Sequence, residues 1–584
     1  MRASLLAFAS TLAIAAPATA GPTEEFEALT DRYWAYVLEQ SPTLATSVGV
    51  TEYDDRLWDN SIEAMDRNAA AAAALLEELA AIDDAGLSAE DRTAKAILAR
   101  SLAQTVEGNR YGQRLMLFTN RGGWHQSVAG LARNLTFDET SDYENYLKRL
   151  AAYPALNANS IEVSRQAVAG GYVLPCVAMV NFEQSITGVI GDQPTATRFY
   201  EPFDRERPSF VPAERWAELQ AEAVRLIDTD LRAAYETHAR WYVDDYAPNC
   251  STEVGISSQP GGADYYDFRI RQFTTTDMSA EEIHQIGLSE VARIRAEMVE
   301  VAAEAGFDSR EAFIEDLRTN PVYYAETPEE LMEVVAREAK RIDGMMPSLF
   351  GHLPRLPYGI REIPAEIAEG TTTAYYNPGS PENGIAGTYY VNTSKLDQRP
   401  LWEVPALTVH EGVPGHHHQI AIQQELDMPQ WRKNGISFTA FVEGWGLYSE
   451  RLGIEMGLYD TPAKDMGRLS YEMWRASRLV VDTGIHAKGW SKQQAIDFML
   501  DNTALSPANI EAEVNRYISW PGQALAYKIG ELKIRELRTM AEEELGDAFS
   551  LKTFHDVVLG QGAVPLDVLE RQVKDWVAEV KAGA

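Results

Sequence analysis

The chain has 584 residues, and its 52 Lys and Arg against 87 Asp and Glu give a formal net charge of −35. Nucleic-acid backbones and anionic membrane surfaces attract basic faces, so this charge excludes both as expected partners. Hydrophobic residues make up 45% and charged residues 24% of the chain. That balance is typical of a globular protein and not of a disordered one.

The first twenty residues have the pattern of a secretory signal peptide. Arg2 precedes an apolar segment at 5–16, and the small residues at 18–20 suit cleavage before Gly21. The apolar segment is too short to cross a bilayer, and no later segment is long enough. We therefore predict a signal peptide at 1–20 and an exported protein, periplasmic or secreted. Residues 21–584 are expected to form a single helical domain of one or two lobes.

Cys176 and Cys250 are the only cysteines. Export exposes them to an oxidising compartment, where a disulfide between them would close a loop of about 74 residues. In the chain-entropy model such a bond contributes roughly 4 kcal/mol. The sequence leaves open the alternative that both are buried thiols that never meet.

Most of the mature chain predicts helix, because apolar residues recur at spacings of three and four. One region differs: residues 371–376 and 387–392 are β-branched and aromatic and flank a turn-rich segment, which predicts two strands. The predicted fold class is therefore mainly α, with one small β-element. The predicted helices are 24–40, 60–84, 87–108, 214–241, 280–305, 327–344, 403–425, 437–457, 463–488, 506–518, 521–545 and 565–581.

Four of the ten histidines lie within residues 410–418. His410 followed by Glu411 matches the start of a zinc motif in which two histidines one turn apart bind the metal and the Glu between them is the base. Here the residue one turn after His410 is Pro414, which cannot bind a metal and disturbs the helix.

Helix geometry narrows the choice of the second ligand. An unbroken helix would place His416 about 120° from the His410 face and His417 about 10 Å along the axis. A bulge at Pro414 would return His416 to that face. We therefore predict His416 as the second ligand, keep His417 as the alternative, and expect His418 at the surface or behind the ligands. A histidine cluster without a metal is the competing interpretation.

A catalytic zinc takes three protein ligands and keeps one position for water. Glu443 lies among apolar and small residues, where an unpaired carboxylate would be costly, so it is the predicted third ligand. Glu450 lies two turns further along but beside Arg451, and we interpret it as part of a structural ion pair. Downstream, Asp482 and His486 share a helix face, where the Asp could hold the imidazole tautomer.

Four motifs in this order, at 410–417, 441–450, 481–486 and 521–530, closely resemble the bacterial domain-of-unknown-function family 885. The resemblance spans nearly the whole mature chain. It implies a mainly helical, two-lobed, zinc-peptidase-like fold with a β-element beside the metal helix. Such a protein is distantly similar to angiotensin-converting enzyme, oligopeptidases and helical carboxypeptidases.

The resemblance also implies roles for single residues. One zinc ion would be held by His410, His416 and Glu443, although the better-known relatives have fewer residues between the Glu and the second histidine. The other expected roles are Glu411 as the general base, His486 and Tyr527 as oxyanion donors, Tyr389, Tyr390 and Asn392 as strand-addition contacts to a peptide backbone, and Arg516 or Lys528 as a partner for a substrate carboxylate.

The sequence thus predicts an exported, zinc-dependent metallopeptidase that hydrolyses short peptides through metal-activated water. The alternative is a non-catalytic protein that binds peptides or metal in the same helical channel, and the presence of Glu411 weighs against it. A serine hydrolase is disfavoured because the sequence has no Gly-x-Ser-x-Gly elbow. No pair of carboxylates indicates glycoside hydrolysis. The choice between exopeptidase and endopeptidase, and the oligomeric state, stay open.

Overall fold

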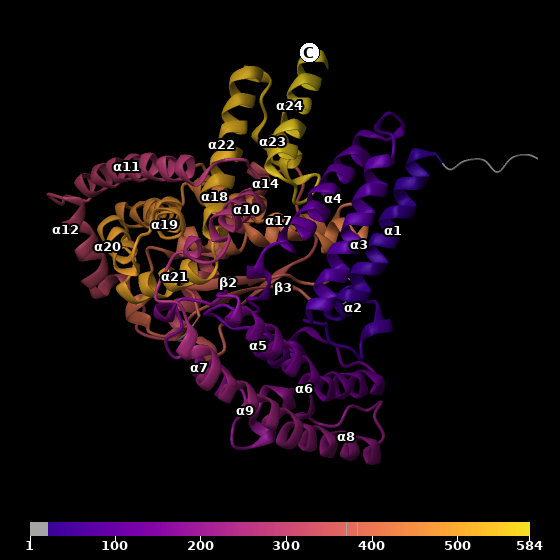
Figure 1. The fold of residues 1–584 in the computed structure, drawn as a ribbon. Helices are drawn as coiled ribbons and strands as arrows, with labels where there is room; N and C mark the ends of the chain where they lie inside the picture. The colour runs from indigo at the N-terminus through magenta and orange to yellow at the C-terminus, as the bar shows by residue number, and fades with distance from the viewer. Residues whose placement is uncertain (1–20, 369–370, 382–383, 584) are drawn as a thin grey trace, which may run out of the picture.

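The structure is a computed structural model that describes residues 21–368, 371–381 and 384–583. The predicted signal peptide at 1–20 lies outside the described residues. The described chain is mainly helical, with three strands in one small sheet, which confirms the predicted fold class (Figure 1). No helix in these ranges combines the length and apolarity needed to cross a bilayer.

The helices expected from apolar periodicity form close to their predicted positions. Ser279 caps its helix, and the side chain of Glu282 closes the capping box. The structure has these helices at α1 Pro22–Gln40, α3 Ile62–Ala81, α4 Ala89–Gly108, α8 Ala213–Arg225, α9 Arg232–Trp241, α11 Ala280–Glu304, α13 Pro328–Asp343, α16 Val404–Glu411, α17 His416–Glu425, α18 Thr439–Leu452, α19 Pro462–Lys488, α21 Pro507–Ser519, α22 Ala526–Leu545 and α24 Leu566–Gly583.

Several helices were not predicted. The longest of all, α6 at Thr140–Ala169, contains Pro154, which reads in sequence as a helix breaker. The other helices outside the prediction are α2 Pro42–Ser47, α5 Trp124–Ala129, α7 Phe182–Thr187, α10 Gly262–Thr274, α12 Arg310–Thr319, α14 Met346–Leu349, α15 Ala365–Ala368, α20 Lys492–Asn502 and α23 Leu551–Leu559.

The small sheet has three strands in the order β1-β3-β2, at Tyr358–Glu362, Gly387–Val391 and Ala374–Asn377. The two predicted strands, β2 and β3, pair antiparallel, and the unpredicted β1 pairs parallel with β3. The central strand β3 therefore has hydrogen-bonded neighbours on both sides, while β1 and β2 are the edges.

Residues 118–246 pack around a hydrophobic core of their own, which is the lower lobe that holds α5 to α9 in Figure 1. Cys176 forms a disulfide with Cys250, which follows this segment in the chain. The backbone N–H of Cys176 donates to the carbonyl of Ser251 at 2.8 Å, so hydrogen bonding and the disulfide hold the same two segments together. The open question of the cysteines is thus decided in favour of a bond.

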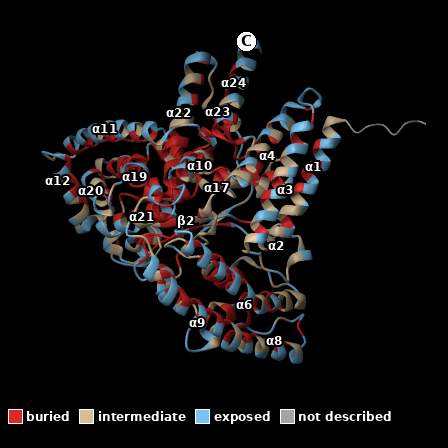
Figure 2. Cartoon of the chain, viewed as in Figure 1, coloured by how far each residue is buried: buried red, intermediate tan, exposed pale blue. Residues whose placement is uncertain are grey.

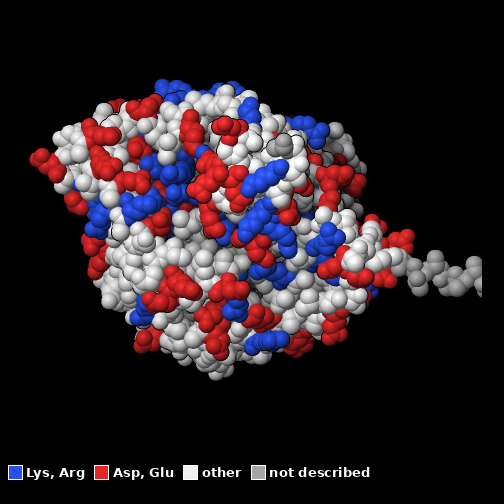
Figure 3. All heavy atoms as spheres, turned by 90° about the horizontal axis from the view of Figure 1, so that it is seen from above, with Lys and Arg blue, Asp and Glu red and all other residues white. Residues whose placement is uncertain are grey.

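Helix α19 runs through the middle of the larger body, and every residue from 466 to 486 is buried. Figure 2 shows buried residues concentrated in α17, α19 and α22, whereas α1, α3 and α8 expose one face. Charged side chains on α19 are consequently enclosed and need partners. At the surface, acidic and basic side chains interleave over the face seen from above (Figure 3).

Candidate metal centre

Three predicted ligands converge from two helices and the segment between them. His410 ends α16, His416 begins α17, and Glu443 lies on α18. One potential ligand atom from each lies within 4.8 Å of the other two. Oε2 of Glu443 is 3.4 Å from Nε2 of His416 and 3.7 Å from Nε2 of His410. Atoms bound at 2.0–2.1 Å to a tetrahedral zinc are roughly 3.3 Å apart, so the spacing suits such an ion.

One of the proposed ligand atoms lacks any other partner. Oε2 of Glu443 is enclosed and has no hydrogen-bond partner in the described part of the chain. A buried carboxylate oxygen without a hydrogen bond is costly unless a cation neutralises it. The arrangement of two imidazoles and one carboxylate is a donor set that zinc accepts.

A break between α16 and α17 brings His416 to His410. Helix α16 ends at Glu411, the Val413–Pro414 peptide bond is cis, and α17 begins at His416. The N–H of Gly415 donates to the carbonyl of Val409 at 2.9 Å, which turns the chain back on itself. The two imidazole rings then lie 4.7 Å apart. The prediction of a continuous helix at 403–425 is therefore wrong, while the prediction that the Pro414 segment returns His416 to His410 is confirmed.

Glu450 holds the other nitrogen of His410. Its carboxylate lies 2.8 Å from Nδ1 of His410 and 3.4 Å from the guanidinium of Arg475. The ring must donate to this carboxylate through Nδ1, which leaves Nε2 free to bind a metal. The predicted structural ion pair of Glu450 is present, but its partner is Arg475 of α19 and not the neighbouring Arg451. The spacing of two turns on one face of α18 brings Glu443 and Glu450 to the same ring, but the prediction gave Glu450 no role toward His410.

The charges of these carboxylates dominate the electrostatics of the metal-free site. Although burial favours the neutral ring, Glu443 and Glu450 raise the pKa of His410 to about 9. Burial likewise opposes ionisation of Glu443, but its contacts with His410 and His416 hold the pKa of that carboxyl well below its usual value. A metal cation would replace the proton that these groups otherwise share.

Glycines allow the helices to approach the site. A Cβ at position 446 would lie 2.8 Å from the His410 ring, so α18 can pass this close only with Gly446. A Cβ at Gly530 would lie 1.9 Å from the carbonyl oxygen of Ala440, which sets α22 directly against α18. This close crossing brings the Tyr527 ring to 6.5 Å from the His410 ring, nearly parallel to it at 17°.

Glu411 follows the first ligand in sequence and is 8% exposed. Its carboxylate forms no hydrogen bond or ion pair with any residue in the described ranges. Its two oxygens are nevertheless not fully enclosed by the protein. Water therefore reaches this carboxylate. A solvated, unpaired carboxylate next to a metal ligand is able to accept a proton.

The remaining two histidines of the cluster face away from the ligands. His417 lies 2.9 Å from the hydroxyl of Tyr376 and 3.0 Å from the carbonyl of Leu356, so it connects α17 to the sheet. His418 is 1% exposed and packs on Phe350 at 4.4 Å between ring centres. Of the two positions expected for His418, burial excludes the surface. His417 is not among the converging residues.

His486 is not an oxyanion donor, contrary to the expectation. Its Nδ1 accepts from the N–H of Ile256 at 3.1 Å, and its Nε2 donates to the carbonyl of Tyr517 at 2.9 Å. Both nitrogens are thus occupied by backbone groups. Asp482 does not hold this ring either, because it accepts from the hydroxyl of Tyr266 at 2.6 Å and the N–H of Gly522 at 3.1 Å.

The expected strand-addition contacts also fail. Tyr389, Tyr390 and Asn392 belong to or directly follow β3, whose backbone already pairs with β1 and β2. Tyr389 and Asn392 are 0% exposed, and the Asn392 amide donates to the carbonyl of Ala368 at 2.7 Å. Tyr390 stacks on Tyr375 at 4.9 Å between ring centres. A peptide could add only to β1 or β2.

The two predicted substrate cations are paired within the protein. Arg516 is 4% exposed and forms an ion pair of 2.8 Å with Glu513, one turn earlier on α21. Lys528 is 0% exposed and lies 2.9–3.0 Å from three carboxylates on α11, α19 and α22. These carboxylates belong to Glu290, Glu472 and Glu531. Lys528 therefore connects the three helices and cannot reach a substrate.

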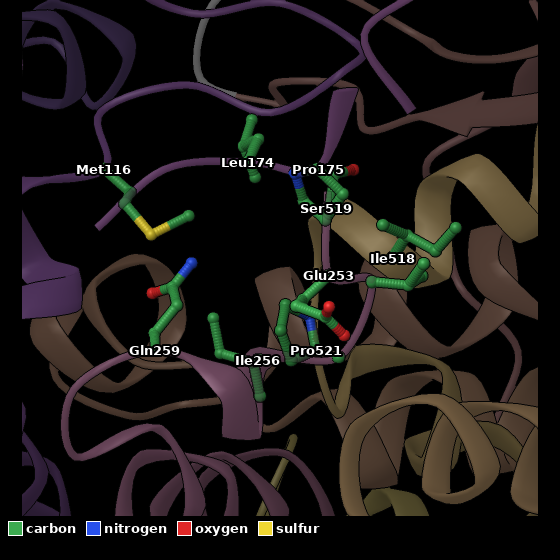
Figure 4. A pocket seen from close by; sticks show the side chains of 11 residues that line it. Met116, Leu174, Pro175, Glu253, Ile256, Gln259, Ile518, Ser519 and Pro521 are labelled. Carbon is green, nitrogen blue, oxygen red and sulfur yellow. The ribbon is translucent and has the colours of Figure 1, made fainter. Parts of the chain in front are cut away.

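A small cavity lies where the lower lobe meets the body, lined by Met116, Leu174, Ile256 and Ser519 among others (Figure 4). It offers about 10 Å³, which is room for roughly one water molecule. It is far too small for a peptide. None of His410, His416, Glu443 and Tyr527 lines this cavity.

The fold and site define a large helical protein with a histidine–glutamate cluster suited to a metal. A family model described as bacterial protein of unknown function (DUF885) matches residues 42–573. The chain belongs to this family, which confirms the resemblance seen in its motifs. A comparison with curated proteins finds no match.

Two solved structures share the fold. A "putative lipoprotein" from Colwellia psychrerythraea is 27% identical, with a TM-score of 0.88 over 96% of this chain and 100% of that one. A "putative lipoprotein of unknown function" from Shewanella oneidensis is 18% identical, with a TM-score of 0.70 over 95% and 99% of the two chains. Neither description names an activity, so the likeness to peptidases rests on the motifs alone.

Proposed function

We propose that this protein is a zinc-dependent peptidase that hydrolyses short peptides through metal-activated water. The observation that carries the proposal is the convergence of His410, His416 and Glu443 beside an unpaired, water-accessible Glu411. A site that only stores a metal has no use for a free carboxylate adjacent to its ligand. Together these groups meet the chemical needs of metal-assisted hydrolysis.

Each group in this site has a separate role in the proposed reaction. A zinc ion, when bound, would supply a Lewis acid that lowers the pKa of a water molecule. Glu411 would take the proton of that water as it attacks the scissile carbonyl. Tyr527 would donate its hydroxyl proton in a hydrogen bond to the developing oxyanion. Burial, followed by the negative charge of Glu443, raises the pKa of Tyr527, so the phenol keeps the proton that it donates.

Export is the second part of the proposal. Residues 1–20 have the composition of a signal peptide, and both solved neighbours are described as lipoproteins, a class of exported protein. The disulfide between Cys176 and Cys250 suits an oxidising compartment. We place the mature chain in the periplasm or outside the cell.

The deciding experiment compares wild type with Glu411→Gln and with the control Glu333→Gln, which changes an exposed glutamate on α13. Metal content and cleavage of a library of unstructured peptides are measured for all three. We expect one zinc per chain in each protein and cleavage by wild type and the control only. Wild type without bound metal, or cleavage by Glu411→Gln at the wild-type rate, would refute the proposal.

A further inference from the structure

A buried arginine of α19, Arg478, lies over the ring of the proposed oxyanion donor. Its guanidinium carbon is 4.4 Å from the centre of the Tyr527 ring on α22. The same carbon is 4.4 Å from the centre of the Trp474 ring, one turn earlier on α19. Arg478 is 3% exposed, and a contact between a cation and a ring is strongest where water is excluded. One guanidinium therefore joins Tyr527 to α19.

Hydrogen bonds along its edge fix the orientation of this guanidinium. Its Nε donates to the hydroxyl of Tyr517 at 2.9 Å, and its Nη2 donates to the carboxylate of Glu513 at 3.0 Å. The Tyr517 hydroxyl also accepts from Nε1 of Trp474 at 2.9 Å and donates to Glu513 at 2.9 Å. Because the group is planar, hydrogen bonds at its edge leave its faces available to the two rings.

Neutralisation of Glu513 does not by itself account for Arg478. Arg516, one turn along the same helix α21, already pairs with this carboxylate at 2.8 Å. Nη1 of Arg478 is enclosed and has no hydrogen-bond partner among the described residues. A second buried arginine with an unpaired donor is costly where one counter-charge is sufficient. What Arg478 adds at this position is its contact with the two aromatic rings.

The Tyr527 ring also faces His410, a proposed metal ligand. The two rings lie 6.5 Å apart and 17° from parallel. An oxyanion donor must keep its place relative to the metal, because a misplacement of about 1 Å can cost about 10²-fold in rate. The side chain of a tyrosine turns about two torsions, so its neighbours decide where the hydroxyl lies. A buried guanidinium that is itself fixed by hydrogen bonds is suited to that task.

We propose that Arg478 is a positioning residue that holds Tyr527 in the orientation needed to donate to the oxyanion. Its hydrogen-bond, ion-pair and ring partners among the described residues include none of the three proposed metal ligands. It therefore acts on the reaction only through the tyrosine. This inference rests on the proposed peptidase function and adds a residue that this function does not by itself require.

The first test is the kinetics of Arg478→Lys, which keeps the positive charge but loses the planar group and its paired edge contacts. We expect full zinc content, a kcat lowered about 10–30-fold and a KM within about twofold of wild type, as loss of a desolvated cation–ring contact implies. The matched control is Arg310→Lys on α12. Arg310 is 5% exposed and donates to the carbonyls of Asp501 and Asn502, so its variant should lose stability but keep kcat.

A double-mutant cycle separates positioning from a merely structural role. In a Tyr527→Phe background, Arg478→Lys should lower kcat by less than about twofold, because the hydroxyl that it positions is absent. Tyr517→Phe, which removes only the hydroxyl that fixes the Arg478 edge, applies the same criterion if Arg478→Lys does not fold. Independent losses in the double variant, zinc loss, or a raised KM with unchanged kcat would overturn the proposal.

The second test observes the tyrosine without catalysis, by ¹⁹F NMR of protein labelled with 3-fluorotyrosine. The Tyr527 resonance is the one missing from Tyr527→Phe. We expect one narrow resonance in wild type and in Arg310→Lys, and a broadened or divided one in Arg478→Lys. A narrow single resonance in Arg478→Lys would overturn the inference while leaving the peptidase proposal intact. A wild type that cleaves nothing would refute the peptidase proposal, and the resonance would then decide whether Arg478 orders Tyr527.

Discussion

The carboxylate of Glu450 lies 2.8 Å from Nδ1 of His410, while Glu443 faces the other nitrogen of the same ring. The imidazole is thereby held between two carboxylates from one helix, α18. Arg475 of α19 pairs with Glu450 at 3.4 Å and keeps it in place. Orientation of the first predicted ligand therefore depends on a helix forty residues away in sequence.

Glu450→Gln should weaken zinc binding about 10–100-fold, because the amide no longer fixes the ring tautomer or increases the basicity of Nε2. Competition with a chelator of known affinity measures the change. Glu455→Gln, one turn beyond α18, removes only a surface ion pair with Arg538 and should leave the zinc affinity unchanged. Equal zinc affinity in both variants would show that Glu450 does not orient His410.

His416→Ala should lose the metal, because it removes one of the three converging donors. His418→Ala should retain it but lower stability by about 3 kcal/mol, since it empties a packed position against Phe350. Zinc content and thermal unfolding of the two purified variants provide the readouts. Metal loss in His418→Ala with full zinc in His416→Ala would overturn the assignment.

Tyr527→Phe should keep zinc and lower kcat about 10²–10³-fold with little effect on KM. The phenolic donor is needed only when negative charge develops on the substrate oxygen. Steady-state kinetics with a cleaved library peptide separates the two parameters. A raised KM with unchanged kcat would make Tyr527 a substrate-binding residue instead.

Stability should fall as the pH drops from 6.5 through 4, with a contribution from His486. Burial lowers the pKa of this histidine from 6.5 to about 4, so its contribution is complete above pH 6.5. Below that pH the unfolded chain takes up a proton that the folded protein excludes. The full difference is about 3 kcal/mol.

Urea unfolding at pH 7 and pH 4.5 tests this expectation. His486→Gln should be less stable than wild type at pH 7, because it disturbs two buried hydrogen bonds. Its stability should also depend less on pH than that of wild type. An identical pH dependence in both proteins would mean that His486 takes up its proton without unfolding.

Much of the fold was predictable because helices follow from nearby residues. The capping box of Ser279 and Glu282 and the apolar periodicity of α11 placed that helix within two residues. The prediction missed α6, which contains Pro154, a residue that is unfavourable inside a helix. It missed β1 because this short strand is stabilised by its parallel partner β3, about thirty residues later.

Some errors in the site were avoidable from local spacing. Glu513 precedes Arg516 by three residues, and Glu531 follows Lys528 by three. Helical neighbours at this spacing form ion pairs, so both cations had partners that were visible in the sequence. The error at His486 was of another kind. Ile256, which donates to His486, lies 230 residues earlier in the chain, and no local pattern indicates that contact.

The sequence by itself determined the family, the mainly helical fold and the three residues that can act as metal ligands. These depend on short-range spacing and on the chemistry of each side chain. Only the tertiary structure decided that Glu450 contacts His410 and that Tyr527 faces the cluster while His486 does not. Burial and pairing are properties of the packed molecule, because each of these contacts joins elements that lie far apart in the chain.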